Sequence, residues 1–227
     1  KTAYEIPLRL VGSEMCIRDR INTPVSPYLQ NAPIVYCDKT KKSIFVDPGD
    51  EAEKLISVSE EHNLKPEFIL ITHGHIDHAG AAVELAQKYN LEIIGPHKDD
   101  KFLLDTLEVQ GQMYGVKAKN FIPDRWLTHN DSIEFADFKL QILHCPGHSP
   151  GHIVAINHES KQIIGGDILF NGSIGRSDLP MGNHQDLIKS IKEHFLTLDD
   201  DYDVYCGHGP NTTIGHERLT NPFLTNA

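Results

Sequence analysis

Hydrophobic and polar residues follow different patterns in the two halves of the chain. In the first half, residues 68–72 (FILIT) predict a buried strand, and residues 51–62 and 79–89 predict amphipathic helices. Residues 33–46 predict two strands around a polar turn. Strands that alternate with helices indicate a sheet with helices on its outer face.

The second half predicts shorter and more closely spaced elements. Helices are expected at residues 186–195 and 214–219. Short apolar runs separated by turn residues predict strands, most of them spaced as in an antiparallel meander: residues 132–135, 138–143, 153–157, 162–166 and 203–206. Two sheets with helices on their outer faces account for this order, and no linker divides the chain. We therefore expect one domain of the α/β (α+β) class.

The first twenty residues fit this order poorly. Residues 11–20 (VGSEMCIRDR) resemble a run that recurs in translated assemblies from adapter read-through. The segment also lacks the apolar stretch and the cleavage site of a secretory signal. We interpret residues 1–20 as a non-native or disordered extension and residues 21–227 as the folded domain.

Composition narrows the classes of function. No apolar run approaches the roughly 18 residues that a membrane-spanning helix needs. The 21 Lys and Arg residues against 32 Asp and Glu residues give a net charge of −11, which argues against nucleic-acid binding. The four cysteines form no CxxC pair and are too sparse for a disulfide framework. We therefore expect reduced thiols and a cytoplasmic location.

Fourteen histidines are the unusual feature of the composition, and several of them cluster in residues 72–80 (THGHIDHAG). This run begins where a predicted strand ends and stops where a helix begins. His73 and His75 lie two apart on an extended backbone, so both side chains point the same way. Asp77 and His78 lie in the turn that enters the helix and project elsewhere. One loop therefore offers two neighbouring sets of ligands suited to zinc, iron or manganese.

Three further candidates each follow a predicted strand and lie beside a glycine. They are His148 in CPGHSPGH, Asp167 in GGD and His208 in CGHG. A single histidine is more often an ordinary core or surface residue. Four possible ligands within six positions, with further candidates in similar settings, favour a metal site built from loops at one edge of the scaffold.

This ordered set of motifs resembles the metallo-β-lactamase superfamily over residues 21–224. The resemblance implies a four-layer αββα sandwich and two divalent metal ions, with zinc as the expected metal and iron or manganese as alternatives. Asp47 matches a family position that braces the site. The implied ligands are, for the first ion, His73, His75 and His148; for the second, Asp77, His78 and His208; and, bridging both, Asp167.

Within the superfamily, residues 172–180 (GSIGRSDLP) and 207–224 resemble the short, single-domain bacterial members of the glyoxalase II group, the hydroxyacylglutathione hydrolases. The resemblance implies hydrolysis of a thioester such as S-lactoylglutathione to a hydroxy acid and a thiol. Asp77, together with a metal-bound hydroxide, is the expected catalytic residue. A thiolate leaves without a dedicated acid, because its conjugate pKa is roughly 8.5. Longer members add a C-terminal helical domain that contacts glutathione, so the thiol carrier stays open.

Other classes of function are weaker alternatives. A mononuclear iron persulfide dioxygenase would keep a similar ligand set, and a lactonase or β-lactamase would hydrolyse a different bond. Many zinc β-lactamases carry Cys at the fourth motif, where this chain has Asp167. An inactive metal-binding scaffold is the third class, and the intact set of seven ligands argues against it. We interpret Arg176 and Asp178 as a structural ion pair.

The expected partner is thus a small-molecule thioester, with no nucleic acid and no membrane, and the oligomeric state stays open. His144 and His152 flank the loop of His148, and we interpret them either as residues that support the ligands from behind or as ordinary residues without a role.

Overall fold

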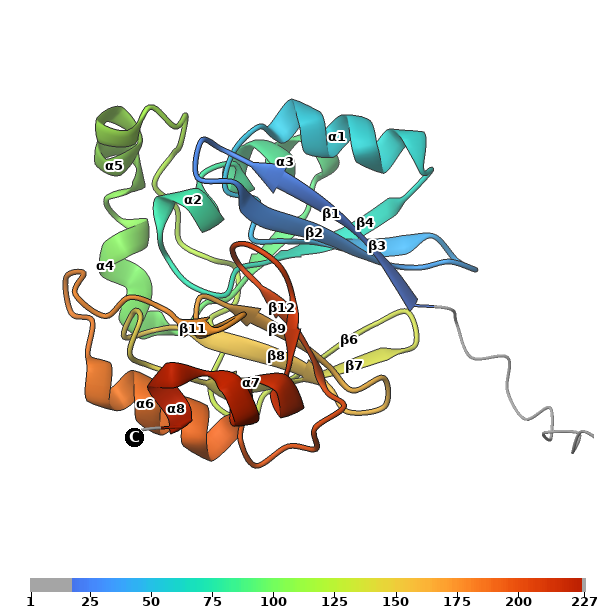
Figure 1. The fold of residues 1–227 in the computed structure, drawn as a ribbon. Coiled ribbons are helices and arrows are strands. Elements are labelled where there is room, and N and C mark those ends of the chain that lie inside the picture. The colour runs from blue at the N-terminus through green and yellow to red at the C-terminus, as the bar shows by residue number, and fades with distance from the viewer. Residues whose placement is uncertain (1–17, 226–227) are drawn as a thin grey trace, which may run out of the picture.

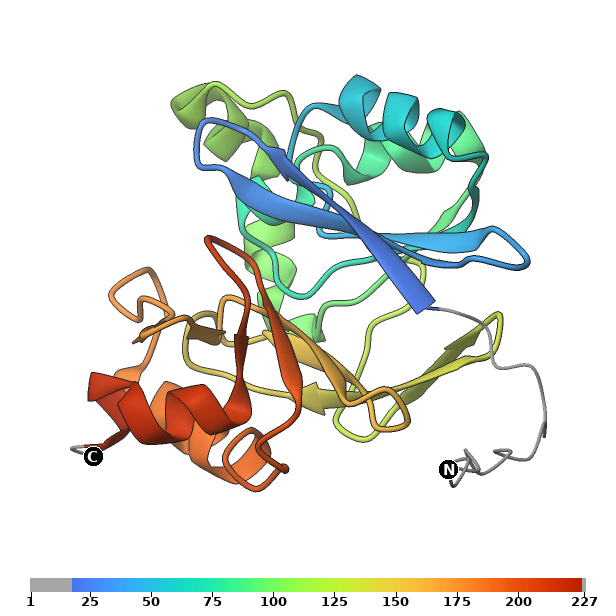
Figure 2. The same cartoon turned by 45° about the vertical axis from the view of Figure 1, so that its right-hand side comes forward.

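The structure is a computed structural model that describes residues 18–225. Two β-sheets lie face to face, and helices cover the outer face of each (Figures 1 and 2). The first sheet has the order β1-β2-β3-β4-β5. Its strands are β1 (Arg18–Val25), β2 (Gln30–Cys37), β3 (Lys42–Val46), β4 (Lys65–Leu70) and β5 (Glu92–Ile94).

The first sheet is antiparallel from β1 to β3 and parallel from β3 to β5. Parallel neighbours need crossover connections. Here α1 (Ala52–Glu61) connects β3 to β4, and α2 (Ile76–Ala79) and α3 (Ala82–Tyr89) connect β4 to β5. The predicted alternation of strands and helices in the first half is therefore confirmed.

The second sheet has the order β13-β12-β9-β8-β7-β6. The strands from β6 to β9 form the predicted antiparallel meander, and β12 then joins β9 in parallel. The strands are β6 (Ser132–Phe135), β7 (Phe138–His144), β8 (Ile153–Asn157), β9 (Gln162–Gly166), β12 (Asp203–Cys206) and β13 (Thr212–Thr213).

The remaining elements lie outside the two sheets. Between β5 and β6 the chain forms the short 3-10 helix η1 (Lys98–Asp100) and the helices α4 (Lys101–Leu104) and α5 (Leu107–Tyr114). A small hairpin of β10 (Leu169–Phe170) and β11 (Ser173–Ile174) follows β9. The outer face of the second sheet carries α6 (His184–His194), α7 (Ile214–Thr220) and α8 (Pro222–Thr225) (Figure 1).

Three hydrophobic cores separate four layers. Along β3, Phe45 packs with Leu55 and Leu85 of the outer helices, whereas Ile44 and Val46 face the space between the sheets. This alternation follows from the two-residue period of a strand. The strands of the second sheet alternate in the same way, with one face toward the first sheet and the other packed against α6 and α7. The predicted four-layer αββα sandwich is confirmed.

The start of the folded domain differs from the expectation. Strand β1 begins at Arg18, inside the segment interpreted as a non-native or disordered extension, and it pairs with β2 along its whole length. The Arg20 guanidinium lies 3.4 Å from the centroid of the Tyr205 ring, so this residue links the first sheet to the second. The interpretation of residues 1–17 falls outside the described residues.

The cysteines depart from the expectation at one position. Cys145 and Cys206 carry free, buried thiols, and burial raises the pKa of Cys206 to about 12. Cys37 is disulfide-bonded, so the expectation of reduced thiols is wrong there.

Across residues 18–225, no helix combines the length and the apolar character needed to cross a membrane.

Candidate metal centre

The candidate site lies where loops from both sheets meet. His73 and His75 follow β4 of the first sheet, and Asp77 and His78 begin α2. The second sheet supplies the other three candidates, each from a loop directly after a strand: His148 after β7, Asp167 after β9 and His208 after β12. The structure brings all seven predicted residues together.

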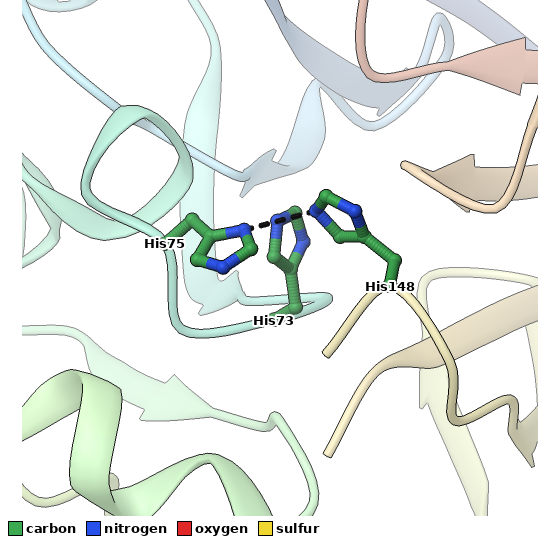
Figure 3. Close-up of side chains that lie close together, drawn as sticks. All are labelled: His73, His75 and His148. Carbon is green, nitrogen blue, oxygen red and sulfur yellow. Dashed lines mark hydrogen bonds between the residues drawn. The ribbon is translucent and has the colours of Figure 1, made fainter. Parts of the chain in front are cut away.

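The first group of donors consists of three imidazoles. His73, His75 and His148 each offer a nitrogen, and these nitrogens lie within 4.8 Å of one another. Figure 3 shows the three rings converging from two loops. His75 Nδ1 lies 2.9 Å from His148 Nε2, and the centroid of the His73 ring lies 4.7 Å and 4.8 Å from those of the other two.

The second group combines one carboxylate with two imidazoles. Asp77, His78 and His208 offer donors within 4.8 Å of one another. His208 Nε2 lies 3.2 Å from Asp77 Oδ2, and His78 Nε2 lies 3.9 Å from the same oxygen. Close approach of the His208 loop requires Gly207, because a Cβ there would lie 2.1 Å from Asp167 Oδ1.

Asp167 lies between the two groups. Its Oδ1 is 3.4 Å from His78 Nε2, and its Oδ2 is 3.6 Å from both His148 Nε2 and His208 Nε2. One carboxylate thus faces nitrogens of the first and the second group.

These separations fit a divalent metal ion. Two ligands on a tetrahedral zinc ion, with bonds of about 2.0–2.1 Å, lie roughly 3.3 Å apart. Among the described residues, His73 Nε2, His78 Nε2 and Asp167 Oδ1 are buried and have no hydrogen-bond partner. Each such atom costs about 1–3 kcal/mol unless something satisfies it. Metal coordination would satisfy all three, so the residues fit the implied ions.

Hydrogen bonds on the far side of the rings leave the required nitrogens free. His148 Nδ1 donates to the carbonyl oxygen of Arg176 at 2.8 Å, and His208 Nδ1 donates to that of Tyr28 at 3.2 Å. In a neutral imidazole such a bond places the proton on Nδ1 and leaves Nε2, the atom that faces Asp167, unprotonated. Against the effect of burial, Asp77 and Asp167 raise the pKa of His208, so metal binding there would displace a proton. In both cases a backbone carbonyl orients the histidine.

Asp47 makes the contacts expected of a bracing residue. Its Oδ2 accepts from His78 Nδ1 at 3.0 Å and from the Thr72 hydroxyl at 2.7 Å, and its Oδ1 accepts from the Thr72 N–H at 2.7 Å. Asp47 therefore joins the second group to the loop that leads into His73.

The two groups differ in charge. Burial lowers the pKa of His75 to about 3 and also lowers the pKa values of His73 and His148, so the first group is neutral. Burial opposes charge in the second group too, but Asp167 and Asp77 raise the pKa of His78 well above its ordinary value. His78 in turn lowers the pKa values of both carboxyls against the effect of burial. Both carboxylates are thus ionised and available as ligands.

Two further buried residues support the site: His152, which the sequence left between a supporting role and none, and Asp100, which the sequence did not indicate. His152 is fully buried, its Nε2 accepts from the Asp167 N–H at 3.0 Å, and its ring stacks on that of His73 at 4.6 Å. The second Gly-His pair in CPGHSPGH was the available signal. Asp100 is also fully buried and bonds to both loops of the first group, and no motif surrounds it in the sequence.

The chain belongs to the metallo-β-lactamase superfamily, whose family model matches residues 27–208. It is 46% identical over 203 residues to the hydroxyacylglutathione hydrolase GloC of Haemophilus influenzae, covering 88% of this chain and 95% of that protein. Among solved structures it is similar to the BLEG-1 B3 metallo-β-lactamase, with 35% identity, a TM-score of 0.83, and 92% of this chain and 100% of that chain covered. TTHA1623 in a di-iron-bound form gives 36% identity, a TM-score of 0.80, and coverage of 90% and 100%.

Proposed function

We propose that this protein is a metal-dependent hydrolase that cleaves a thioester of the hydroxyacylglutathione class, such as S-lactoylglutathione, to a hydroxy acid and a thiol. The observation that carries the proposal is the single carboxylate, Asp167, that faces a neutral group and a charged group of donors at once. The relative GloC, named for this activity, spans nearly the same length and supports the choice of substrate class.

The seven residues would hold two divalent ions. His73, His75 and His148 would hold the first ion, and Asp167 would contact both. Asp77, His78 and His208 would hold the second. We propose zinc as the native metal because His and Asp donors suit it, with iron as the alternative that the di-iron form of TTHA1623 supports. When bound, such ions activate water and polarise a carbonyl oxygen.

Asp77 is the proposed catalytic residue. Its carboxylate is ionised because His78 lowers its pKa, and its side chain keeps 20% exposure, against 10% for Asp167. Asp77 can therefore accept a hydrogen bond from the attacking water and orient it toward the substrate. The departing thiolate needs no acid, since its conjugate pKa is about 8.5.

Exposed side chains beside the ligands define where the substrate would enter. Tyr28, whose carbonyl orients His208, is 47% exposed and packs edge-on against Tyr114, with ring centroids 6.4 Å apart. Arg176, whose carbonyl orients His148, pairs with Asp178 through two bonds of 2.8 Å at the surface. We propose that the two tyrosines contact the thiol portion of the substrate, while the Arg176–Asp178 pair holds its loop.

The decisive experiment is steady-state hydrolysis of S-lactoylglutathione by protein reconstituted separately with zinc and with iron. A clear rate that Asp167→Ala abolishes supports the proposal. The matched control is Asp105→Ala, which removes an exposed carboxylate paired with Lys101. Protein that binds metal and turns over no thioester overturns it, and oxygen uptake with glutathione persulfide would then favour a dioxygenase.

A second candidate is β-lactam hydrolysis. The BLEG-1 B3 metallo-β-lactamase is 35% identical to this chain and shares its fold. The same metal-loaded protein should therefore be assayed with a chromogenic cephalosporin. A rate there without thioester hydrolysis would replace the first proposal.

We also propose a small-molecule substrate and a cytoplasmic location. The net charge of −11 opposes nucleic-acid partners. The small number of cysteines favours a reducing compartment, and the disulfide at Cys37 is the observation that opposes it. Cell fractionation tests the location directly.

A further inference from the structure

Asp100 is a fully buried carboxylate that belongs to neither donor group. It is the last residue of η1, and its side chain bonds to two loops. Oδ2 accepts from the Gly74 N–H at 2.8 Å and from the Ser149 hydroxyl at 2.7 Å. Oδ1 accepts from the Gly151 N–H at 2.5 Å. One side chain therefore connects loops that are far apart in the sequence.

The bonded positions lie directly beside ligands of the first group. Gly74 stands between His73 and His75, and Ser149 follows His148. The second group has its own brace, because Asp47 bonds to His78. The contacts of Asp100 thus fix the three imidazoles of the first group relative to one another.

Close packing allows little movement of this connection. A Cβ at Gly74 would lie 2.7 Å from the Cβ of Leu103, and a Cβ at Gly151 would lie 2.4 Å from the backbone nitrogen of Asp100. The His97 N–H also donates to the Gly151 carbonyl at 3.0 Å. The turn that carries Asp100 is therefore wedged between the two loops.

The charge of Asp100 is compensated mainly by the N–H and O–H donors of Gly74, Ser149 and Gly151, with a smaller electrostatic contribution from His144. Within residues 18–225, no lysine or arginine forms an ion pair with it, and burial raises its pKa to about 6. A buried carboxylate without a cationic partner is costly. A side chain that only joined two loops would not need a negative charge. A side chain that supports three neutral imidazoles in binding a cation would benefit from one.

We infer that Asp100 is the positioning residue of the first donor group and sets the affinity of that group for a divalent metal independently of the second group. The inference requires that the groups bind metal and does not require a thioester as substrate. If the protein does not hydrolyse a thioester, the inference about Asp100 is therefore unaffected.

The test measures zinc affinity of each group separately in the full chain. His208→Ala impairs the second group and leaves the first intact, and His148→Ala does the reverse. Asp100→Asn is introduced into each background, and Asp105→Asn, which changes an exposed carboxylate paired with Lys101, is the matched control. Zinc affinity of metal-free protein is measured by competition with a chromophoric chelator, and far-UV circular dichroism reports the fold.

In the His208→Ala background, Asp100→Asn should lower zinc affinity by about 10- to 100-fold, the usual effect of removing a partner behind a ligand. In the His148→Ala background the change should stay below about threefold. The control Asp105→Asn should change the zinc affinity of neither group. Equal losses in both backgrounds would show a general structural role and overturn the inference, and so would an unchanged affinity of the first group.

Should Asp100→Asn fail to fold, Ser149→Ala replaces it. This change removes one hydrogen bond and keeps the carboxylate. It should lower zinc affinity only in the His208→Ala background, by a smaller factor than Asp100→Asn. Equal effects in the two backgrounds, or none in either, would again overturn the inference.

Discussion

The two donor groups share Asp167 but differ in charge and in the side chains that hold them. The first consists of imidazoles that burial keeps neutral, and Asp100 holds its two loops together. The second contains the ionised Asp77 beside His78, and Asp47 braces it. The difference suggests separate tasks. The neutral ligands of the first group would leave the positive charge of a bound ion uncompensated, whereas the second group supplies Asp77 as the residue that orients water.

The largest expected effect comes from removing the shared residue. Asp167→Ala should impair metal binding by both groups alike, because each group loses the carboxylate that they share. We expect thioester hydrolysis to fall on the order of 10³-fold or more, as when one member of a cooperative catalytic set is lost. Steady-state kinetics at saturating zinc measure this, and retention of more than about a tenth of the rate would contradict it.

Addition of metal should stabilise the apo protein strongly. Three buried donors lack partners in its absence, and zinc that binds only the folded state adds about 4 kcal/mol at a thousandfold excess over Kd. For a chain of this size, that corresponds to a rise in Tm of roughly 10 °C. Differential scanning calorimetry with and without zinc measures the shift, and magnesium is the control. An equal shift with magnesium would indicate nonspecific stabilisation.

Removing the brace of the second group should weaken that group alone. Asp47→Asn leaves His78 Nδ1 with a poorer acceptor, and we expect zinc affinity of the second group to fall by about 10-fold. The same chelator competition in the His148→Ala background measures it, with Asp50→Asn, which changes a half-buried aspartate three residues away, as the control. An equal loss in the first group would mean that Asp47 acts through Thr72, to which it also bonds.

A pH dependence should distinguish the first group. The pKa of Asp100 is about 6 in the folded protein against 3.8 in the unfolded chain, so folding favours its protonated form. Its contribution to stability is full below about pH 4 and is lost as the pH rises through about 6, a change of at most about 3 kcal/mol. Urea unfolding of metal-free wild type and Asp100→Asn across pH 4–7 measures it. Parallel curves for the two proteins would contradict the assignment.

The sequence predicted those parts of the site that a short local motif marks. His73, His75, Asp77 and His78 form one run, and His148 and His208 stand beside glycines after strands. Hydrophobic periodicity likewise predicted the layers, because each strand faces two cores. Local patterns marked the layers and the candidate ligands, and the resemblance to the superfamily assigned those ligands to two ions.

The remaining parts depend on contacts between distant segments. Asp100 bonds to positions 26, 49 and 51 residues away, and nothing in its neighbourhood marks it out. Strand β1 escaped prediction because its segment carries an atypical sequence, and its pairing with β2 is visible only in the fold. Such residues are recognised only when the loops are in place.

Each donor group draws on both sheets of the sandwich. His73 and His75 come from the first sheet and His148 from the second, and Asp77 and His78 come from the first and His208 from the second. Either half of the chain alone therefore offers at most two of the three donors of a group. A metal ion held by such a group is a cross-link between the halves, and its tight retention reports that they have assembled correctly. Misassembled chains would release the ion, so the metal content of a preparation would also report the fraction of correctly folded protein.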